Sequence, residues 1–126
     1  MNFPADLKYT KDHEWVRVTD GGAVVGITAF AQDELGEIVY VDLPAVGSAI
    51  TQKGVLCVVE STKAASDVYA PISGSVVEAN ARLADEPALV NSDPYGEGWL
   101  VKLSGISESE LQSLMSADEY RTLVHR

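Results

Sequence analysis

The chain has 126 residues, 46% of them hydrophobic, which is enough for one compact domain with its own core. Nineteen Asp and Glu residues against nine Lys and Arg residues give a formal net charge of −10. This balance argues against nucleic-acid binding and against docking on an anionic membrane, because both need a basic surface.

The first third of the chain is predicted to hold strands around one helix. Alternating apolar and polar residues, with a Gly-Gly turn between them, predict an antiparallel strand pair over residues 13–18 and 23–27. Thr28 can cap a short helix that ends at Gly36. A β-branched run over residues 38–43 predicts the next strand.

The middle of the chain is predicted to be all β. Short strands are expected over residues 49–50, 55–60, 66–70 and 75–78, with turn residues between them. Residues 47–50 and 74–77 share the pattern Gly-Ser-x-aliphatic, which is too short to establish a duplication. A helical turn over residues 86–90 and a turn cluster over residues 91–98 lead into a strand over residues 99–103.

The C-terminal stretch changes to a helical pattern. Ser107 and Ser116 are each followed three residues later by Glu, which is the arrangement of a capping box. Two short helices are therefore expected within residues 107–124, docked through Leu111, Leu114, Met115 and Leu123. Together these elements predict a single, mainly β domain over residues 1–126, with a few short helices and a C-terminal helical tail.

Few residues in this sequence suit enzymatic or metal chemistry. The motifs G-x-S-x-G, P-loop and H-E-x-x-H are absent. Cys57 lies in an aliphatic strand and is interpreted as a buried, inert thiol, and one Cys with two distant His residues cannot build a closed zinc site. His13 and Glu14 are adjacent on a predicted strand, so their side chains should point to opposite faces and not share a site.

The location of the protein is inferred from what the chain lacks. The N-terminus has no basic and apolar regions of a secretory signal, and the longest aliphatic run, residues 55–59, is too short to span a bilayer. A single cysteine fits a reducing compartment. We therefore expect a bacterial cytoplasm, which the initial Met favours over a mitochondrial matrix.

The most informative segment is a polar turn between two strand-like arms over residues 55–70. Lys63 lies at this turn and is the only cationic residue between Lys53 and Arg82. A lone turn lysine is usually no more than a solvated side chain. The residues around Lys63 are small, however, so its ammonium group should be accessible to a modifying enzyme.

At this turn the sequence resembles a known family. Residues 60–67, ESTKAASD, are similar to the lipoyl-lysine hairpin of the glycine cleavage system H-protein family. Residues 9–15, 35–41 and 89–100 (YTKDHEW, LGEIVYV and LVNSDPYGEGWL) resemble further signatures of that family, in the same order. Thr62 stands where Val is common and residues 50–57 are less typical, but neither departure touches Lys63.

The resemblance implies a lipoyl-type β-sandwich, or hammerhead barrel, with lipoate amide-linked to Lys63. It implies that Glu60, Gly74 and Gly47 help the lipoylating enzyme to recognise the hairpin. The implied function is that of a non-catalytic carrier, expected to be a monomer. It would accept an aminomethyl group from a pyridoxal-phosphate glycine decarboxylase and pass it to a tetrahydrofolate-dependent aminomethyltransferase. A dihydrolipoyl dehydrogenase would then reoxidise it.

Such a carrier should shelter its cargo, because an aminomethyl thioether exposed to water could hydrolyse. The cargo amine is cationic, so a carboxylate beside the sheltering groove would help to hold it. Glu14 and Asp67 are the candidates favoured by the resemblance, and their alternative is an ordinary surface role. The apolar wall is predicted to include Ile27, Phe30 and Leu35, for which simple core packing is the alternative.

Four other interpretations compete with this one. A biotin carrier usually has Met on both sides of its lysine, whereas Lys63 has Thr62 and Ala64. The lipoyl domain of a 2-oxo acid dehydrogenase is generally shorter and lacks the helical tail. A Schiff-base enzyme would need a neighbouring cation or desolvation to activate Lys63, and no cation is near it in sequence. An unmodified binding module remains open until the mass of the native protein is measured.

Overall fold

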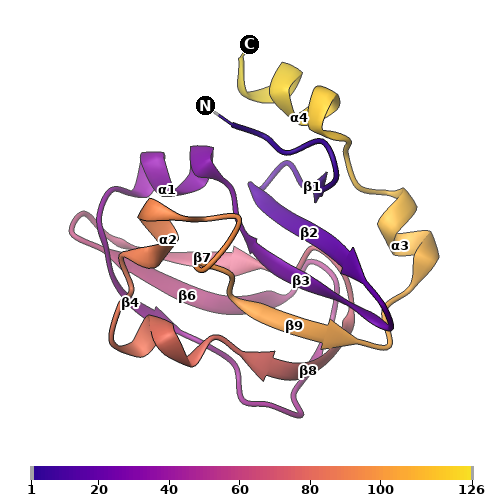
Figure 1. Ribbon diagram of the computed structural model, residues 1–126, viewed down its shortest axis with the longest axis horizontal. Coiled ribbons are helices and arrows are strands. Elements are labelled where there is room, and N and C mark those ends of the chain that lie inside the picture. Colours follow the sequence, from indigo (N-terminus) through magenta and orange to yellow (C-terminus); the bar gives the residue numbers. More distant parts are fainter. Residues whose placement is uncertain (1, 126) are drawn as a thin grey trace.

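The computed structural model describes residues 2–125, in which nine strands form two antiparallel sheets (Figure 1). The larger sheet has the order β1 (Lys8–Tyr9), β2 (Glu14–Thr19), β3 (Gly22–Ile27), β9 (Val101–Ser104), β8 (Gly74–Ala79) and β5 (Ala49–Ile50). The smaller sheet has the order β4 (Ile38–Asp42), β6 (Val55–Ser61) and β7 (Ala65–Tyr69). The mainly β fold is confirmed, and the two sheets stay separate without closing into a barrel.

Short helices cover the edges of the sheets. They are α1 (Ala29–Leu35), the 3-10 helix η1 (Ala81–Ala84), α2 (Leu89–Ser92), α3 (Glu108–Gln112) and α4 (Ala117–Val124). The predicted boundaries of α1 are confirmed. The Thr28 hydroxyl accepts a hydrogen bond from the Ala31 amide at 3.1 Å, and the helix ends at Gly36, whose φ is 85°.

One of the two predicted capping boxes is wrong. Ser116 and Glu119 form a complete capping box at the start of α4. Ser107 makes no side-chain cap at α3, since its hydroxyl lies 2.9 Å from the Ser109 hydroxyl, and the Glu110 carboxylate accepts hydrogen bonds from the amide and hydroxyl of Ser73. Ser73, which is 37 residues away in the sequence, therefore binds the carboxylate that the capping box would have used.

The predicted helical turn over residues 86–90 is displaced, since α2 begins at Leu89 and continues into the predicted turn cluster. Two further elements, β1 and η1, were not predicted from the sequence and are two and four residues long. Elements this short carry too few residues for a periodic pattern, so their formation depends on tertiary contacts.

The protein has two hydrophobic clusters. The main core lies between the sheets and includes Val25, Val59 and Leu100, all fully buried. A second, aromatic cluster holds the two ends of the chain against β2, and Tyr9 and Tyr120 stack within it at 4.8 Å. The C-terminal helix is therefore docked beside the N-terminal segment, as Figure 1 shows.

Trp15 is the largest side chain in this aromatic cluster, and its position depends on a glycine. Its indole N–H lies 3.0 Å from both the Ile27 and the Pro94 carbonyl oxygens. The ring covers Gly26, its partner in the β2–β3 register, so that a Cβ on Gly26 would lie 2.6 Å from the indole.

We expect Gly26→Ala to destabilise the protein by about 1–3 kcal/mol, because the added methyl group overpacks against the Trp15 ring. Urea denaturation followed by far-UV circular dichroism measures the change. Val77→Ala is the control, since this strand residue is 52% exposed and should cost little. Equal stability of Gly26→Ala and the parent protein would contradict the packing described here.

Candidate functional site

The β6–β7 hairpin ends in a tight turn that presents Lys63. The Ser61 amide donates to the Ala64 carbonyl at 2.9 Å, and the Ser61 hydroxyl oxygen accepts from the amides of Lys63 and Ala64. These bonds fix the turn without any bulky side chain near its tip. Lys63 is exposed there, as predicted.

The tip of the hairpin lies against the C-terminal end of α1. The Thr62 amide donates to the Glu37 carbonyl at 3.0 Å, and Lys63 Nζ donates to the Glu34 carbonyl at 3.4 Å. The stem of Lys63 passes over Gly36, where an added Cβ would contact its Cε at 3.4 Å. Helix α1 therefore determines where the lysine side chain lies.

Asn91 of α2 holds this end of α1 in place. Its side-chain amide N–H group donates to Gln32 Oε1 and to the Gly36 carbonyl, each at 2.9 Å. Its oxygen accepts from the Ile38 amide at 2.8 Å. Asn91 lies within the matched signature over residues 89–100, but its sequence surroundings did not indicate this contact.

A cavity of about 140 Å³ lies between α1, β7 and the start of β2. Ile27, Leu35 and Val68 supply apolar walls. Carboxylates also line it, and these are Asp12, Glu14, Glu34 and Asp67. Four of the five residues predicted for a cargo groove, namely Glu14, Asp67, Ile27 and Leu35, are thus brought together. Because Glu34 also accepts from Lys63, the cavity and the lysine meet at the same helix end.

Phe30, the fifth residue predicted for the groove, does not line this cavity. It packs into the aromatic cluster, with its ring 4.7 Å from the His13 imidazole. Successive residues of a helix face different directions, so Ala31 and Leu35 reach the cavity while Phe30 turns toward the cluster.

His13 lines the cavity together with Glu14, although the sequence argument separated them. Their side chains would point to opposite faces only if both residues lay on one strand. The strand begins only at Glu14, and His13 precedes it with φ of 73°. A left-handed residue breaks the alternation of side chains, and a non-glycine residue in this conformation leaves no clear signal in the sequence.

Glu14 is a buried carboxyl group, with 2% of its surface exposed. Burial raises its pKa to about 7, while a hydrogen bond from the Thr10 hydroxyl at 2.7 Å acts in the opposite direction. The Asp12 charge raises the pKa further. Near neutral pH this group is therefore present in both its protonated and its ionised form, and a cation placed beside it would favour the ionised form.

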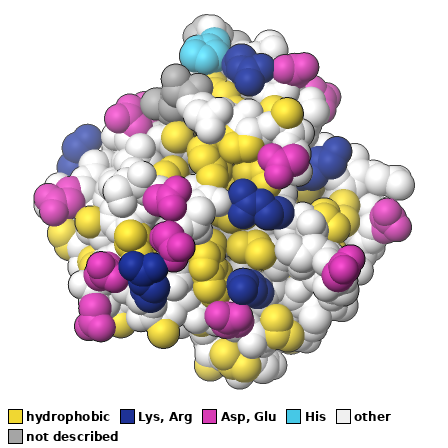
Figure 2. All heavy atoms as spheres, in the orientation of Figure 1, with side chains coloured by type: hydrophobic (Ala, Val, Ile, Leu, Met, Phe, Trp, Pro, Cys, Tyr) yellow, Lys and Arg dark blue, Asp and Glu magenta, His cyan; other side chains and the backbone are white. Residues whose placement is uncertain are grey.

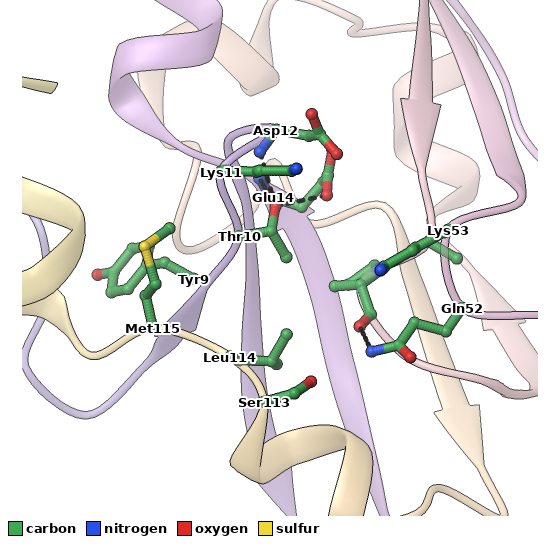
Figure 3. Close-up of a pocket in the computed structure, with 12 residues that line it drawn as sticks. Tyr9, Thr10, Lys11, Asp12, Glu14, Gln52, Lys53, Ser113, Leu114 and Met115 are labelled. Carbon is green, nitrogen blue, oxygen red and sulfur yellow. Dashed lines mark hydrogen bonds between the residues drawn. The ribbon is translucent and has the colours of Figure 1, made fainter. Parts of the chain in front are cut away.

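A second cavity, of about 280 Å³, also has Glu14 among the residues that line it (Figure 3). Lys11 and Lys53 stand on opposite sides of it, above Leu114 and Met115 from the C-terminal segment. The two cavities share Asp12 and Glu14. Glu14 therefore forms part of the wall between them.

Of the residues predicted for recognition, only Glu60 is close to Lys63. It is exposed on β6, opposite Tyr40 and Ala65. Gly47 and Gly74 lie at the β5–β8 edge of the other sheet, where the two Gly-Ser-x-aliphatic stretches pair with each other. Gly47 has φ of 94°, and a Cβ on Gly74 would lie 2.8 Å from the Ser104 carbonyl, so both glycines have a backbone role.

Other reactive groups are not arranged for chemistry. Burial raises the pKa of the Cys57 thiol to about 12, so it stays protonated and unreactive. Residues 2–125 contain no group of three His, Cys, Asp or Glu side chains that could hold a metal ion. None of the helices in the same range has the length and hydropathy that a membrane crossing requires.

Comparison with known proteins gives consistent matches over nearly the whole chain. The model of the family described as "Glycine cleavage H-protein" matches residues 7–126. A glycine cleavage system H protein from Listeria monocytogenes is 48% identical over 124 residues, covering 98% of this chain and 99% of the relative. The H protein from Methylacidiphilum infernorum is 52% identical over 124 residues, covering 98% and 97%. The crystal structure of a glycine cleavage system H protein from Mycobacterium marinum matches with a TM-score of 0.88 and 39% identity, covering 98% of this chain and 100% of that one.

The raised pKa of Glu14 predicts a specific pH dependence of stability. Below pH 4.5 the carboxyl is protonated in both states, so its burial costs little. As the pH rises from 4.5 to about 7 the unfolded chain loses this proton first, and the free energy of unfolding falls. We expect Glu14→Gln to remove this part of the decline, which amounts to roughly 3 kcal/mol.

Urea denaturation of both proteins across this pH range measures the difference. Asp67→Asn is the matched control, because it neutralises an exposed carboxylate of the same cavity. It should follow the pH profile of the parent protein. Parallel profiles for Glu14→Gln and the parent protein would contradict the effect assigned to burial.

Proposed function

The chain belongs to the glycine cleavage H-protein family, and on this basis we propose that its lipoate is amide-linked to Lys63. The protein is a non-catalytic lipoyl carrier that works with the enzymes of the glycine cleavage system. The observation that carries the assignment to Lys63 is its exposed position on a rigid turn beside the acidic cavity.

The residues around Lys63 fit a lipoyl arm. Ile27, Leu35 and Val68 offer apolar contact to a hydrocarbon chain, and Glu14 and Asp67 offer negative charge to an amine. When bound, lipoate supplies a disulfide that takes up the aminomethyl group and is later regenerated by oxidation. The remaining work falls to this chain, which holds the tip of the hairpin against the end of α1 through the Thr62 amide and excludes water with the walls of the cavity.

Glu14 is proposed to hold the cationic amine of the cargo. Because its pKa is raised, Glu14 is protonated near pH 7 in part of the molecules that carry no cargo. In those molecules the free-energy cost of burying a charged carboxylate is absent. An ammonium group beside it would favour the carboxylate, and loading would then release a proton. Asp67 is exposed at the rim and is proposed to assist by long-range attraction.

The four proposed partners are the pyridoxal-phosphate glycine decarboxylase, the tetrahydrofolate-dependent aminomethyltransferase, the dihydrolipoyl dehydrogenase and the lipoylating enzyme. Acidic side chains are spread over the face in Figure 2, with isolated basic ones among them, which supports partners with positive patches. We propose Glu60 as a contact for the lipoylating enzyme, with Gly47 and Gly74 contributing to recognition of the hairpin by preserving the backbone at the β5–β8 edge. The proposed form is a cytoplasmic monomer.

The assignment of Lys63 is tested by intact mass spectrometry. We expect protein from lipoate-replete cells to carry one lipoyl group per chain, and Lys63→Arg to carry none. Lys53→Arg is the control, because it changes another exposed lysine beside a cavity and should keep the modification. An unmodified parent protein, or a lipoylated Lys63→Arg, would refute the assignment.

The role of Glu14 is tested on lipoylated protein loaded from glycine by the decarboxylase. We expect loaded Glu14→Gln to release its amine faster than the parent, by up to about tenfold for each 1.4 kcal/mol of attraction that is lost. Asp20→Asn neutralises an exposed carboxylate in the β2–β3 turn and serves as the control. Unchanged release from Glu14→Gln would remove Glu14 from the proposed site.

A further inference from the structure

A chain of hydrogen bonds connects helix α1, helix α4 and the cavity beside Lys63. The Ala31 amide donates to the Thr28 hydroxyl oxygen at 3.1 Å. Thr28 Oγ1 lies 2.7 Å from the Tyr120 hydroxyl, which in turn lies 2.7 Å from His13 Nδ1. This chain joins residues 107 positions apart in the sequence, and it ends on an imidazole that lines the cavity.

Burial decides which group donates and which accepts at each hydrogen bond of this chain. Thr28 is fully buried, so its hydroxyl cannot donate to water. Within residues 2–125, the Tyr120 oxygen is the one hydrogen-bond partner to which it can donate. Tyr120 is also fully buried and must then give its own proton to His13 Nδ1. His13 is therefore an acceptor at Nδ1, which places the imidazole proton on Nε2.

The surroundings of His13 agree with a neutral ring. Burial lowers the pKa of His13 below its usual value of 6.5, and the nearby charges of Asp12 and Glu34 only partly oppose this. The Phe30 ring packs against the His13 imidazole, and the left-handed backbone of His13 sets the direction in which this side chain leaves the chain. Nε2 makes no hydrogen bond within residues 2–125, and His13 is one of the residues that line the cavity.

We propose that Tyr120 and Thr28 are positioning residues for the cargo cavity, which hold His13 as a neutral imidazole with its Nε2–H free to donate to the lipoyl arm. This proposal rests on the function proposed for the cavity. It extends the site to helix α4, whose docking would otherwise be explained by stability alone.

The neutrality of His13 matters because of the other charges around it. The ionisable groups around it are Asp12 from the turn before β2, Glu14 from the start of β2, Glu34 from α1, Asp67 from β7 and the Tyr120 hydroxyl from α4. Four of these five are carboxyl groups, which suit a cationic amine. A protonated His13 would place a like charge beside that amine and weaken its binding. The hydrogen-bond chain thus keeps the cavity selective for a cation.

The first test uses the unmodified protein, labelled with ¹⁵N, and reads the imidazole nitrogens of His13 by long-range ¹H–¹⁵N NMR at a series of pH values. We expect the Nε2–H tautomer in the parent protein at pH 7. Tyr120→Phe should give a mixture of tautomers and raise the pH at which His13 titrates, because the donor to Nδ1 is lost.

Tyr9→Phe is the matched control. Tyr9 is as buried as Tyr120 and stacks on it, but its hydroxyl donates to the Pro4 carbonyl at 2.7 Å and not to His13. Its removal should leave the tautomer unchanged. An Nδ1–H tautomer in the parent protein, or equal changes in both variants, would overturn the proposal. The parent measurement alone decides this if Tyr120→Phe does not fold.

The second test uses lipoylated, aminomethyl-loaded protein and measures release of the amine as the pH is lowered through 6.5. We expect Tyr120→Phe to release it several-fold faster than the parent, with Tyr9→Phe like the parent. Equal release from Tyr120→Phe and the parent would overturn the link to the cargo. A missing lipoyl group at Lys63 would instead refute the proposed function, while the tautomer result would stand by itself.

Discussion

The position of helix α1 is the constraint on which the site depends. Its first turn is fixed by Thr28, which caps the helix and bonds to Tyr120, and its last turn is fixed by Asn91. Between these two anchors the helix supplies one wall of the cavity and the carbonyl that receives Lys63. A shift of this seven-residue helix would move the cavity and the lysine together.

The cavity is lined by acidic residues, yet two ionisable groups in its wall, the buried Glu14 and the half-buried His13, do not carry a permanent charge. Glu14 is buried with a pKa near neutrality, so its charge can follow the presence of a cation. His13 is held neutral by its neighbours, so it does not cancel the surrounding negative charge. The net charge of the whole chain has the same sign, which attracts cationic groups to the protein from a distance.

Local signals in the sequence predicted α1, the β6–β7 hairpin and the mainly β architecture, because caps, turns and alternation act between residues close in the chain. The family resemblance, not a local signal, pointed to Glu14 and Asp67, and the structure places both residues in the wall of one cavity. The contacts made by His13 and by Asn91 depend on partners that only the tertiary structure brings near. At Ser107 the capping box is lost in both halves, since its hydroxyl pairs with Ser109 and the Glu110 carboxylate pairs with the distant Ser73.

The contact between Lys63 and the end of α1 has a consequence for the freedom of the arm. A helix C-terminus carries unpaired carbonyl groups and partial negative charge, and these attract the ammonium group of Lys63. Acylation converts this nitrogen to a neutral amide, which keeps a single N–H but loses the attraction. The Lys63 side chain is thus held at the end of α1 while it is unmodified, which is the form that a modifying enzyme binds. Acylation then weakens this contact. The amide bond formed at Lys63 Nζ would then both attach the arm and free the side chain to move.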